Sequence, residues 1–212
     1  MKLHNYFRSS ASYRVRIALN LKGLAYDYLP VHLVKGDQFT DGFRALSPDG
    51  IVPVLETDGA RLTESLAIIE YLEETNPEPP LLPKDAIGRA RVRAIALAIA
   101  CEIHPLNNLR VLGYLTGKLG LDEDKKNAWY KTWVESGLTA VERQLAQSKA
   151  TGKFCHGDKP GLADTFLIPQ IFNAKRFNCR TDNLPTAMRI YDACTALPAF
   201  DKAQPSKQPD AE

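Results

Sequence analysis

The sequence predicts two domains of different class, a small α/β domain followed by an all-helical domain. In residues 1–76, short runs of β-branched and aromatic residues alternate with helical periodicity, in the order β-α-β and then β-β-α. Residues 77–83 contain four prolines, so no regular element continues through them and they read as a linker. Residues 84–212 show helical periodicity, which predicts a second, all-helical domain.

The first domain has four predicted strands and two main helices. Ser9, Ser10 or Ser12 caps the first helix, which Gly23 ends, and Asp58-Gly59 forms a hairpin turn. Pro30 confines its strand to a sheet edge. The predicted strands are 2–7, a stretch within 25–34, 52–56 and 60–63; the second main helix is 65–74, and 35–46 is a loop running into a short helix.

The second domain consists of four predicted helices. The first is long, spans 85–119 and is kinked at Pro105, because proline cannot continue the hydrogen-bond ladder of a helix. Asp164 is an N-cap or first-turn acid of the third helix. The remaining helices are 122–149, 161–177 and 185–196, and a polar tail follows Phe200.

Composition narrows the class of protein. The chain has 212 residues, 44% of them hydrophobic and 25% charged, with a net charge of +2, so nothing indicates a nucleic-acid or membrane partner. There is no secretory signal pattern and no long apolar run, so we expect a cytoplasmic protein. The four cysteines have no metal-ligand spacing, which predicts buried free thiols and no metal site.

The turn after the first strand carries the chemistry. The N-terminus of a helix stabilises an anion, including a thiolate. A thioredoxin-like unit that performs redox chemistry keeps a Cys-x-x-Cys pair at this place, whereas this chain reads Ser9-Ser10-Ala11-Ser12. If thiol chemistry occurs here, the sulfur must arrive with a cofactor. The alternative is that these serines only cap the helix.

The motifs FRSSASYRVRIALNLKG, GIVPVLE, LTESLAIIEYLEE, HPLNNL, GLADTFLIPQ, NAKRF and PSKQPDAE resemble those of the zeta-class glutathione transferases, in the family's order over nearly the whole chain. The resemblance implies a thioredoxin-like N-terminal domain, an all-α C-terminal domain, glutathione as cofactor and a homodimer. It also implies glutathione-dependent cis–trans isomerisation of a dicarboxylic cis-enedione by reversible thiolate addition. Maleylpyruvate would become fumarylpyruvate, or maleylacetoacetate would become fumarylacetoacetate, in the catabolism of aromatic compounds.

The resemblance also implies roles for residues of the first domain. Either Ser9 or Ser10 donates a hydrogen bond to the thiolate of glutathione. Val52 precedes a cis proline and pairs through its backbone with the cysteinyl part of glutathione. Glu64 and Ser65 begin a helix and bind the γ-glutamyl end, and Gln38 is a weaker candidate for the glycyl end.

Cationic side chains are needed to bind the carboxylates of such a substrate. Arg8 adjoins the serines, and Arg176 lies in the family motif NAKRF; both are candidate catalytic and carboxylate-binding residues. His104 and Asn108 share one face of the predicted helix, where a lone histidine is more often structural. Their place in the motif HPLNNL makes them, by the resemblance, candidate contacts of glutathione. Arg110 is about 120° away from His104 around an ideal helix. It reaches the same cleft only if Pro105 alters the helical phase or its side chain bends over.

Two other functions compete with the isomerase. A general glutathione transferase that conjugates electrophiles would have an apolar substrate site, whereas this sequence supplies Arg8, Arg110 and Arg176. A non-catalytic scaffold that binds a protein partner would have no reason to keep the FRSS, VP and ES motifs together. Activity on both acidic substrates, with and without glutathione, discriminates among the three.

Overall fold

The protein divides into two compact units. The computed structural model describes residues 1–212. Met1–Leu81 and Thr195–Glu212 form the first unit, and Leu82–Cys194 form the second. The sequence predicts a single helical domain over residues 84–212. In the structure, residues 195–212 belong instead to the first unit. Their contacts with the first helix, described below, are the reason.

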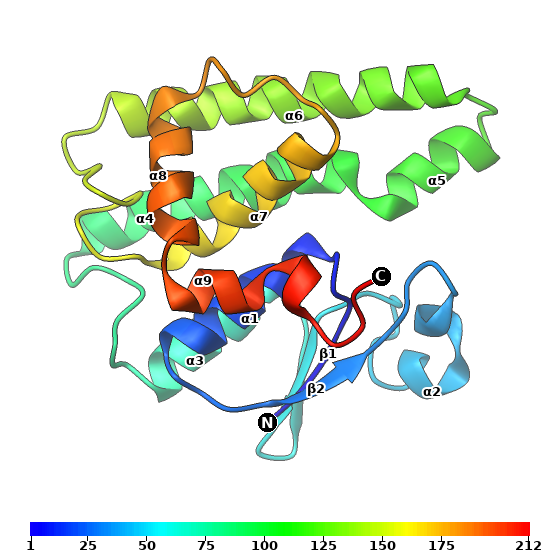
Figure 1. The fold of residues 1–212 in the computed structure, drawn as a ribbon. Coiled ribbons are helices and arrows are strands. Elements are labelled where there is room, and N and C mark those ends of the chain that lie inside the picture. Colours follow the sequence, from blue (N-terminus) through cyan, green and yellow to red (C-terminus); the bar gives the residue numbers. More distant parts are fainter. The chain divides into compact units, whose positions relative to one another are not determined.

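The first unit contains a four-stranded mixed sheet (Figure 1). Its central strand β1 (Lys2–Asn5) pairs in parallel with β2 (Asp27–Pro30) and antiparallel with β3 (Val54–Thr57). The antiparallel strand β4 (Ala60–Leu62) completes the order β2-β1-β3-β4. β2 lies at an edge and ends at Pro30, as the missing proline N–H requires.

The first unit has two main helices. α1 (Ser10–Leu21) and α3 (Ser65–Thr75) pack against each other. At one end of this pair the Lys22 ammonium, buried beneath the surface, lies 2.7 Å from a carboxylate oxygen of Glu73. The short helices η1 (Asp37–Phe39), a 3-10 turn, and α2 (Asp41–Arg44) lie between β2 and β3 in the chain.

The segment after residue 197 is structured, although the sequence shows only a polar tail. It forms α9 (Pro198–Ala203) and the 3-10 turn η4 (Pro205–Lys207). α9 packs on α1, where the fully buried Arg16 donates from Nε to the carbonyl oxygen of Ala203 at 3.1 Å. No local sequence pattern predicts this hydrogen bond, because its two residues are 187 positions apart in the chain.

The second unit is built around α7 (Leu162–Arg176), whose residues from Leu162 to Ile171 are all buried. α7 packs on α4 (Ala86–Leu97) and α6 (Glu123–Ala146), and α8 (Pro185–Thr195) follows it in the chain. Asp164 at the start of α7 accepts hydrogen bonds from the backbone N–H groups of Gly161 and Cys155. None of the helices has the length and apolar character that a membrane span needs.

The prediction of one long helix over 85–119 is wrong, because this segment is interrupted between α4 and the next α-helix. After α4 the chain passes through a π-helical turn, η2 (Ala98–Ile103), and a 3-10 turn, η3 (His104–Asn107). Asn108 then adopts an extended conformation, and α5 (Leu109–Gly117) begins afresh. Pro105 supplies no N–H to the ladder, and the Asn108 side chain caps α5 by accepting from the Arg110 N–H, so the chain breaks instead of kinking.

Candidate active site

The two predicted serines lie at the N-terminus of α1. Ser9 is the N-cap, and its Oγ accepts a hydrogen bond from the Ser12 N–H at 3.2 Å. The Ser9 N–H donates to the Tyr6 carbonyl oxygen at 3.0 Å, which closes the turn between β1 and α1. Ser10 is the first helical residue and is buried. Because Ser9 Oγ serves the cap as an acceptor, its own O–H remains able to donate to an anion.

Arg8 is held beside this turn. Its Nη2 and Nε donate to the Tyr6 hydroxyl at 2.8 and 3.2 Å. Its guanidinium carbon lies 4.9 Å from the centroid of the Phe7 ring, within cation–π range. The side chain is half-buried, so its cation has a restricted position directly before Ser9.

Val52 and Gln38 approach the same region. The Val52-Pro53 bond is cis, as the resemblance implies, and Val52 packs in one apolar cluster with Tyr6 and Phe7. Gln38 Nε2 donates to the Leu33 carbonyl oxygen, while its buried Oε1 has no hydrogen-bond partner. Such an acceptor suits a donor group on a ligand.

A glycine joins these two residues. Gly50 has a φ of +62°, and a Cβ there would lie 2.9 Å from the backbone oxygen of Gln38. The loop that leads to Pro53 therefore passes too close to η1 for any side chain at this position.

The N-terminus of α3 is the second anion-binding feature of the first unit. Glu64 occupies its N-cap position with a φ of +64°, a strained conformation that clusters at ligand sites. Ser65 begins the helix, and its Oγ accepts from Nη1 of Arg14 at 3.2 Å. Arg14 is only 3% exposed. A buried cation behind a helix N-terminus favours a carboxylate there.

Arg14 is a site residue that sequence reasoning missed. It lies in the run RVRIAL, where a charged residue between apolar neighbours is a signal of a buried partner.

In the second unit, the break before α5 brings His104 and Asn108 together. Asn108 Nδ2 lies 3.1 Å from His104 Nε2, in hydrogen-bond contact. The prediction that this pair shares a helical face is wrong, because Asn108 lies outside the 3-10 turn that contains His104. Asn108 and Arg110 line one pocket of about 380 Å³, whose other walls are Pro105, Val111 and Tyr114. The changed helical phase thus places Arg110 beside Asn108.

Arg176 lies elsewhere in the second unit. It is the last residue of α7 and is exposed. Its guanidinium carbon is 5.1 Å from the centroid of the Phe177 ring, which stacks on Tyr130 of α6. Arg176 is not among the residues that line the pocket of Asn108 and Arg110.

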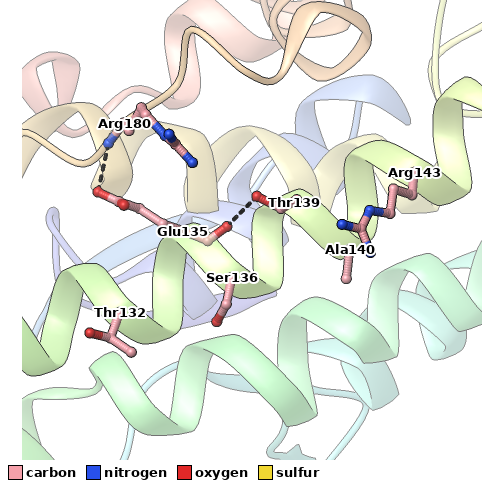
Figure 2. A pocket seen from close by; sticks show the side chains of 7 residues that line it. All are labelled: Thr132, Glu135, Ser136, Thr139, Ala140, Arg143 and Arg180. Atoms are coloured by element: carbon pink, nitrogen blue, oxygen red, sulfur yellow. Dashed lines mark hydrogen bonds between the residues drawn. The ribbon is translucent and has the colours of Figure 1, made fainter.

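A different pocket, of about 440 Å³, lies along α6 and contains none of the predicted site residues (Figure 2). Its hydroxyl and carboxylate groups already have partners within the protein. Thr139 Oγ1 donates to the Glu135 carbonyl oxygen at 2.7 Å, and Glu135 Oε1 accepts from the Arg180 N–H at 2.8 Å. This pocket therefore shares no residue with the candidate site.

Comparisons with known proteins identify the family. Residues 3–80 match the family described as "Glutathione S-transferase, N-terminal domain". A maleylpyruvate isomerase of Ralstonia sp is 48% identical over 100% of both chains. A solved holo maleylpyruvate isomerase, described as a bacterial glutathione S-transferase of the zeta class, superposes with a TM-score of 0.98 at 48% identity over 100% of both chains. A maleylacetoacetate isomerase from Methylobacterium extorquens, solved with malonate and glutathione, gives a TM-score of 0.97 at 41% identity, again over 100% of both chains. The chain therefore belongs to the zeta class of the glutathione S-transferases.

Proposed function

We propose that this protein is a glutathione-dependent cis–trans isomerase that converts maleylpyruvate to fumarylpyruvate, or maleylacetoacetate to fumarylacetoacetate. The observation that carries the proposal is the serine turn at the start of α1, which offers hydroxyl and helix N-terminal donors and no protein thiol. Full-length relatives that bear the names of both isomerases support it.

The first unit suits glutathione, a tripeptide anion. The α3 N-terminus, with Glu64, Ser65 and the buried Arg14 behind them, suits the γ-glutamyl end, whose ammonium Glu64 would accept. The Val52 backbone would pair with the cysteinyl residue, and Gln38 would contact the glycyl end. The Methylobacterium relative, solved with glutathione, supports this choice of cofactor.

Bound glutathione supplies a thiolate, whose reversible addition to the substrate double bond permits rotation about that bond. The task of the chain is to favour the thiolate, since a free thiol has a pKa of about 8.5. A shift of one pKa unit needs about 1.4 kcal/mol of preferential stabilisation. The Ser9 hydroxyl and the α1 N-terminus would provide it together. We assign the donor to Ser9 rather than Ser10, because Ser9 is the less buried of the two and its O–H is not needed by the cap.

Arginines would bind the two acidic ends of the substrate. Arg8, Arg110 and Arg176 are each proposed as carboxylate partners, because the guanidinium group binds carboxylates in a bidentate manner. His104 and Asn108, which hydrogen-bond to each other, are proposed contacts of glutathione. Malonate, bound together with glutathione in the Methylobacterium relative, is itself a dicarboxylate and supports an acidic substrate.

The resemblance to the zeta class supports a homodimer as the working form. A cytoplasmic location is proposed on the chemistry of the thiols. All four cysteines are free, and a cofactor thiol must stay reduced to act, which fits a reducing compartment. No nucleic-acid or membrane partner is proposed for this function.

Turnover of maleylpyruvate and maleylacetoacetate by the purified protein tests the cofactor. Isomerisation should be absent without glutathione and restored by it catalytically, because the turn contains no cysteine. Turnover that persists after exhaustive removal of glutathione would refute this assignment. The substrate with the higher kcat/KM identifies the physiological one.

Removal of Arg176 tests the isomerase against a general transferase. Arg176→Ala should lower kcat/KM for maleylpyruvate about ten- to a hundredfold, the equivalent of a charge-assisted hydrogen bond of about 1.5–3 kcal/mol. It should leave glutathione affinity and the conjugation of an uncharged aromatic electrophile nearly unchanged. Arg143→Ala is the matched control, since Arg143 is an exposed arginine of the other pocket of the second unit. Equal losses on charged and neutral substrates would favour the general transferase.

A further inference from the structure

Two charged side chains hydrogen-bond to the backbone of Phe7, one at its N–H and one at its carbonyl oxygen. The Asp210 carboxylate oxygen Oδ2 accepts from the Phe7 N–H at 3.1 Å. The Arg16 Nη2 group donates to the Phe7 carbonyl oxygen at 2.9 Å. Arg16 Nη1 also donates to the Tyr6 carbonyl oxygen at 3.3 Å, the same oxygen that accepts from the Ser9 N–H. The backbone leading into the Arg8–Ser9 turn is therefore fixed by side chains from outside it.

Asp210 is itself anchored. Its second carboxylate oxygen accepts a hydrogen bond from the Tyr28 hydroxyl of β2. The buried Gln208 folds the preceding segment back on itself, since its Nε2 donates to the carbonyl oxygens of Lys202 and Gln204. These contacts, together with the Arg16–Ala203 hydrogen bond, give the Asp210 carboxylate a defined place between Tyr28 of β2 and the Phe7 backbone that follows β1.

We propose that Asp210 is a positioning residue for the isomerase, which fixes the Phe7 peptide and thereby the placement of Arg8 and Ser9. The proposal rests on the proposed function for the roles of those two residues. Arg8 and Ser9 follow Phe7 directly, so a rotation of the Phe7 peptide moves both groups. Catalytic groups need placement within about 0.5 Å, and a displacement of 1 Å costs about a hundredfold in rate.

The motif that contains Asp210 has no other assigned role. PSKQPDAE is one of the stretches by which the chain resembles its family, yet none of its side chains is among the proposed site residues. Asp210 acts indirectly, because its hydrogen bond to the Phe7 N–H positions the backbone that carries Arg8 and Ser9. The Asp210 carboxylate also places a negative charge near the buried Arg16, whose own hydrogen bonds go to neutral oxygens.

Three variants test the proposal. Asp210→Ala removes both hydrogen bonds, and Asp210→Asn keeps the shape and one acceptor oxygen. The control Asp201→Asn removes a carboxylate of the same segment that contacts only Gln204 and Lys207. Glutathione affinity by calorimetry, the pKa of the bound thiol by ultraviolet absorbance, steady-state kinetics and deuterium uptake of residues 5–12 in the free protein are measured for each.

Asp210→Ala should raise deuterium uptake at residues 5–12, raise the pKa of the bound thiol and lower kcat about tenfold or more. Asp210→Asn should fall between Asp210→Ala and the parent protein, and it replaces the alanine variant if that fails to fold. Asp201→Asn should behave as the parent. An Asp210 variant that melts at a lower temperature but keeps the parent uptake, thiol pKa and kcat would overturn the proposal and leave a structural role alone.

Failure of the proposed function gives a different pattern. A parent protein that isomerises neither substrate refutes the isomerase, while deuterium uptake and thiol pKa still report whether Asp210 fixes the turn.

Discussion

At the start of α1 two adjacent serines occupy unequal positions. Ser9 caps the helix through its side chain, and Ser10 is already helical. Ser9→Ala should lower the free energy of unfolding by about 1 kcal/mol, whereas Ser9→Gly should cost only a few tenths, because glycine is a tolerable N-cap.

Ser9→Gly therefore separates chemistry from stability. Because it removes the proposed thiolate donor, kcat/KM should fall about ten- to a hundredfold, while Ser10→Ala should stay within about threefold of the parent protein. Chemical denaturation and steady-state kinetics on the same preparations provide both measurements. The reverse order of activities would assign the donor to Ser10.

A hydrogen bond across β1 and β3 predicts a small pH dependence. His4 lies 2.7 Å from Glu56 and, through this hydrogen bond, lowers the pKa of Glu56 below its ordinary value. The folded-state pKa is thus below the unfolded one, so the contribution to stability is present above the unfolded pKa of about 4.3 and is lost as the pH falls through the folded pKa.

Thermal melting from neutral to acid pH checks this expectation. The difference in melting temperature between the parent protein and Glu56→Gln should shrink as the pH falls below about 4.3. Glu74→Gln, at an exposed carboxylate of α3, is the control and should show no such trend. A Glu56 difference that is constant with pH would mean that the hydrogen bond does not depend on the carboxylate charge.

Residues differ in how far the sequence alone reveals them. Ser9, Val52 and Ser65 sit in short motifs whose local chemistry indicates a strand end, a proline turn or a helix start, and the structure has these features there. Arg16 and Asp210 act through partners far along the chain, so no local pattern specifies their contacts.

At the scale of elements, helix α6 packs closely against the π-helical turn η2 at Gly137, where the absence of a side chain leaves room for Ile103. A Cβ on Gly137 would lie 2.4 Å from Cγ1 of the buried Ile103. Glycine to alanine in a helix is normally stabilising by about 0.5–1 kcal/mol. Here overpacking should reverse the sign, and Gly137→Ala should lower the free energy of unfolding by about 1–3 kcal/mol.

Gly113 of α5 is the matched control, because nothing lies within 4 Å of a Cβ at that position. Gly113→Ala should be stabilising by up to about 1 kcal/mol. Urea denaturation of both variants measures the two signs. Stabilisation by Gly137→Ala would show that Ile103 moves aside without cost.

Amphipathic periodicity predicts α6, α7 and α8 within a few residues of their observed ends. It does not predict the break after Ile103. Periodicity shows which helical face is apolar, but it does not show whether the backbone hydrogen bonds of the helix continue without interruption. The signal that was present is Pro105 followed by Asn107 and Asn108, a pair of residues that favour caps and turns.

At the scale of the whole molecule, the reactivity of the four cysteine thiols shows whether the second unit is folded. Cys155, Cys179 and Cys194 are buried in it, and burial raises the pKa of Cys179 to about 11. Cys101 is exposed. At neutral pH one thiol per chain should therefore react rapidly with a disulfide reagent, and all four should react in denaturant.

Cys101→Ser should abolish the rapid phase of this thiol titration. Rapid reaction of two or more thiols in the folded protein would contradict the burial of the other three.

The division into units is a property that sequence reasoning captures only in part. The proline-rich stretch marks the first change of unit, because composition changes there. The second change, at Thr195, has no such marker. It depends on the packing of α9 against α1, which only the folded chain displays.

The contact between Phe7 and Asp210 spans 203 positions of the chain, and this has a consequence for synthesis. The ribosome releases Met1–Leu81 first, then the whole of Leu82–Cys194, and only afterwards the segment that carries Asp210. At about 5–20 residues per second, translation of this stretch takes about 10–40 seconds. Throughout this interval the nascent turn lacks its carboxylate partner, so the turn is completed only after Asp210 has left the ribosome.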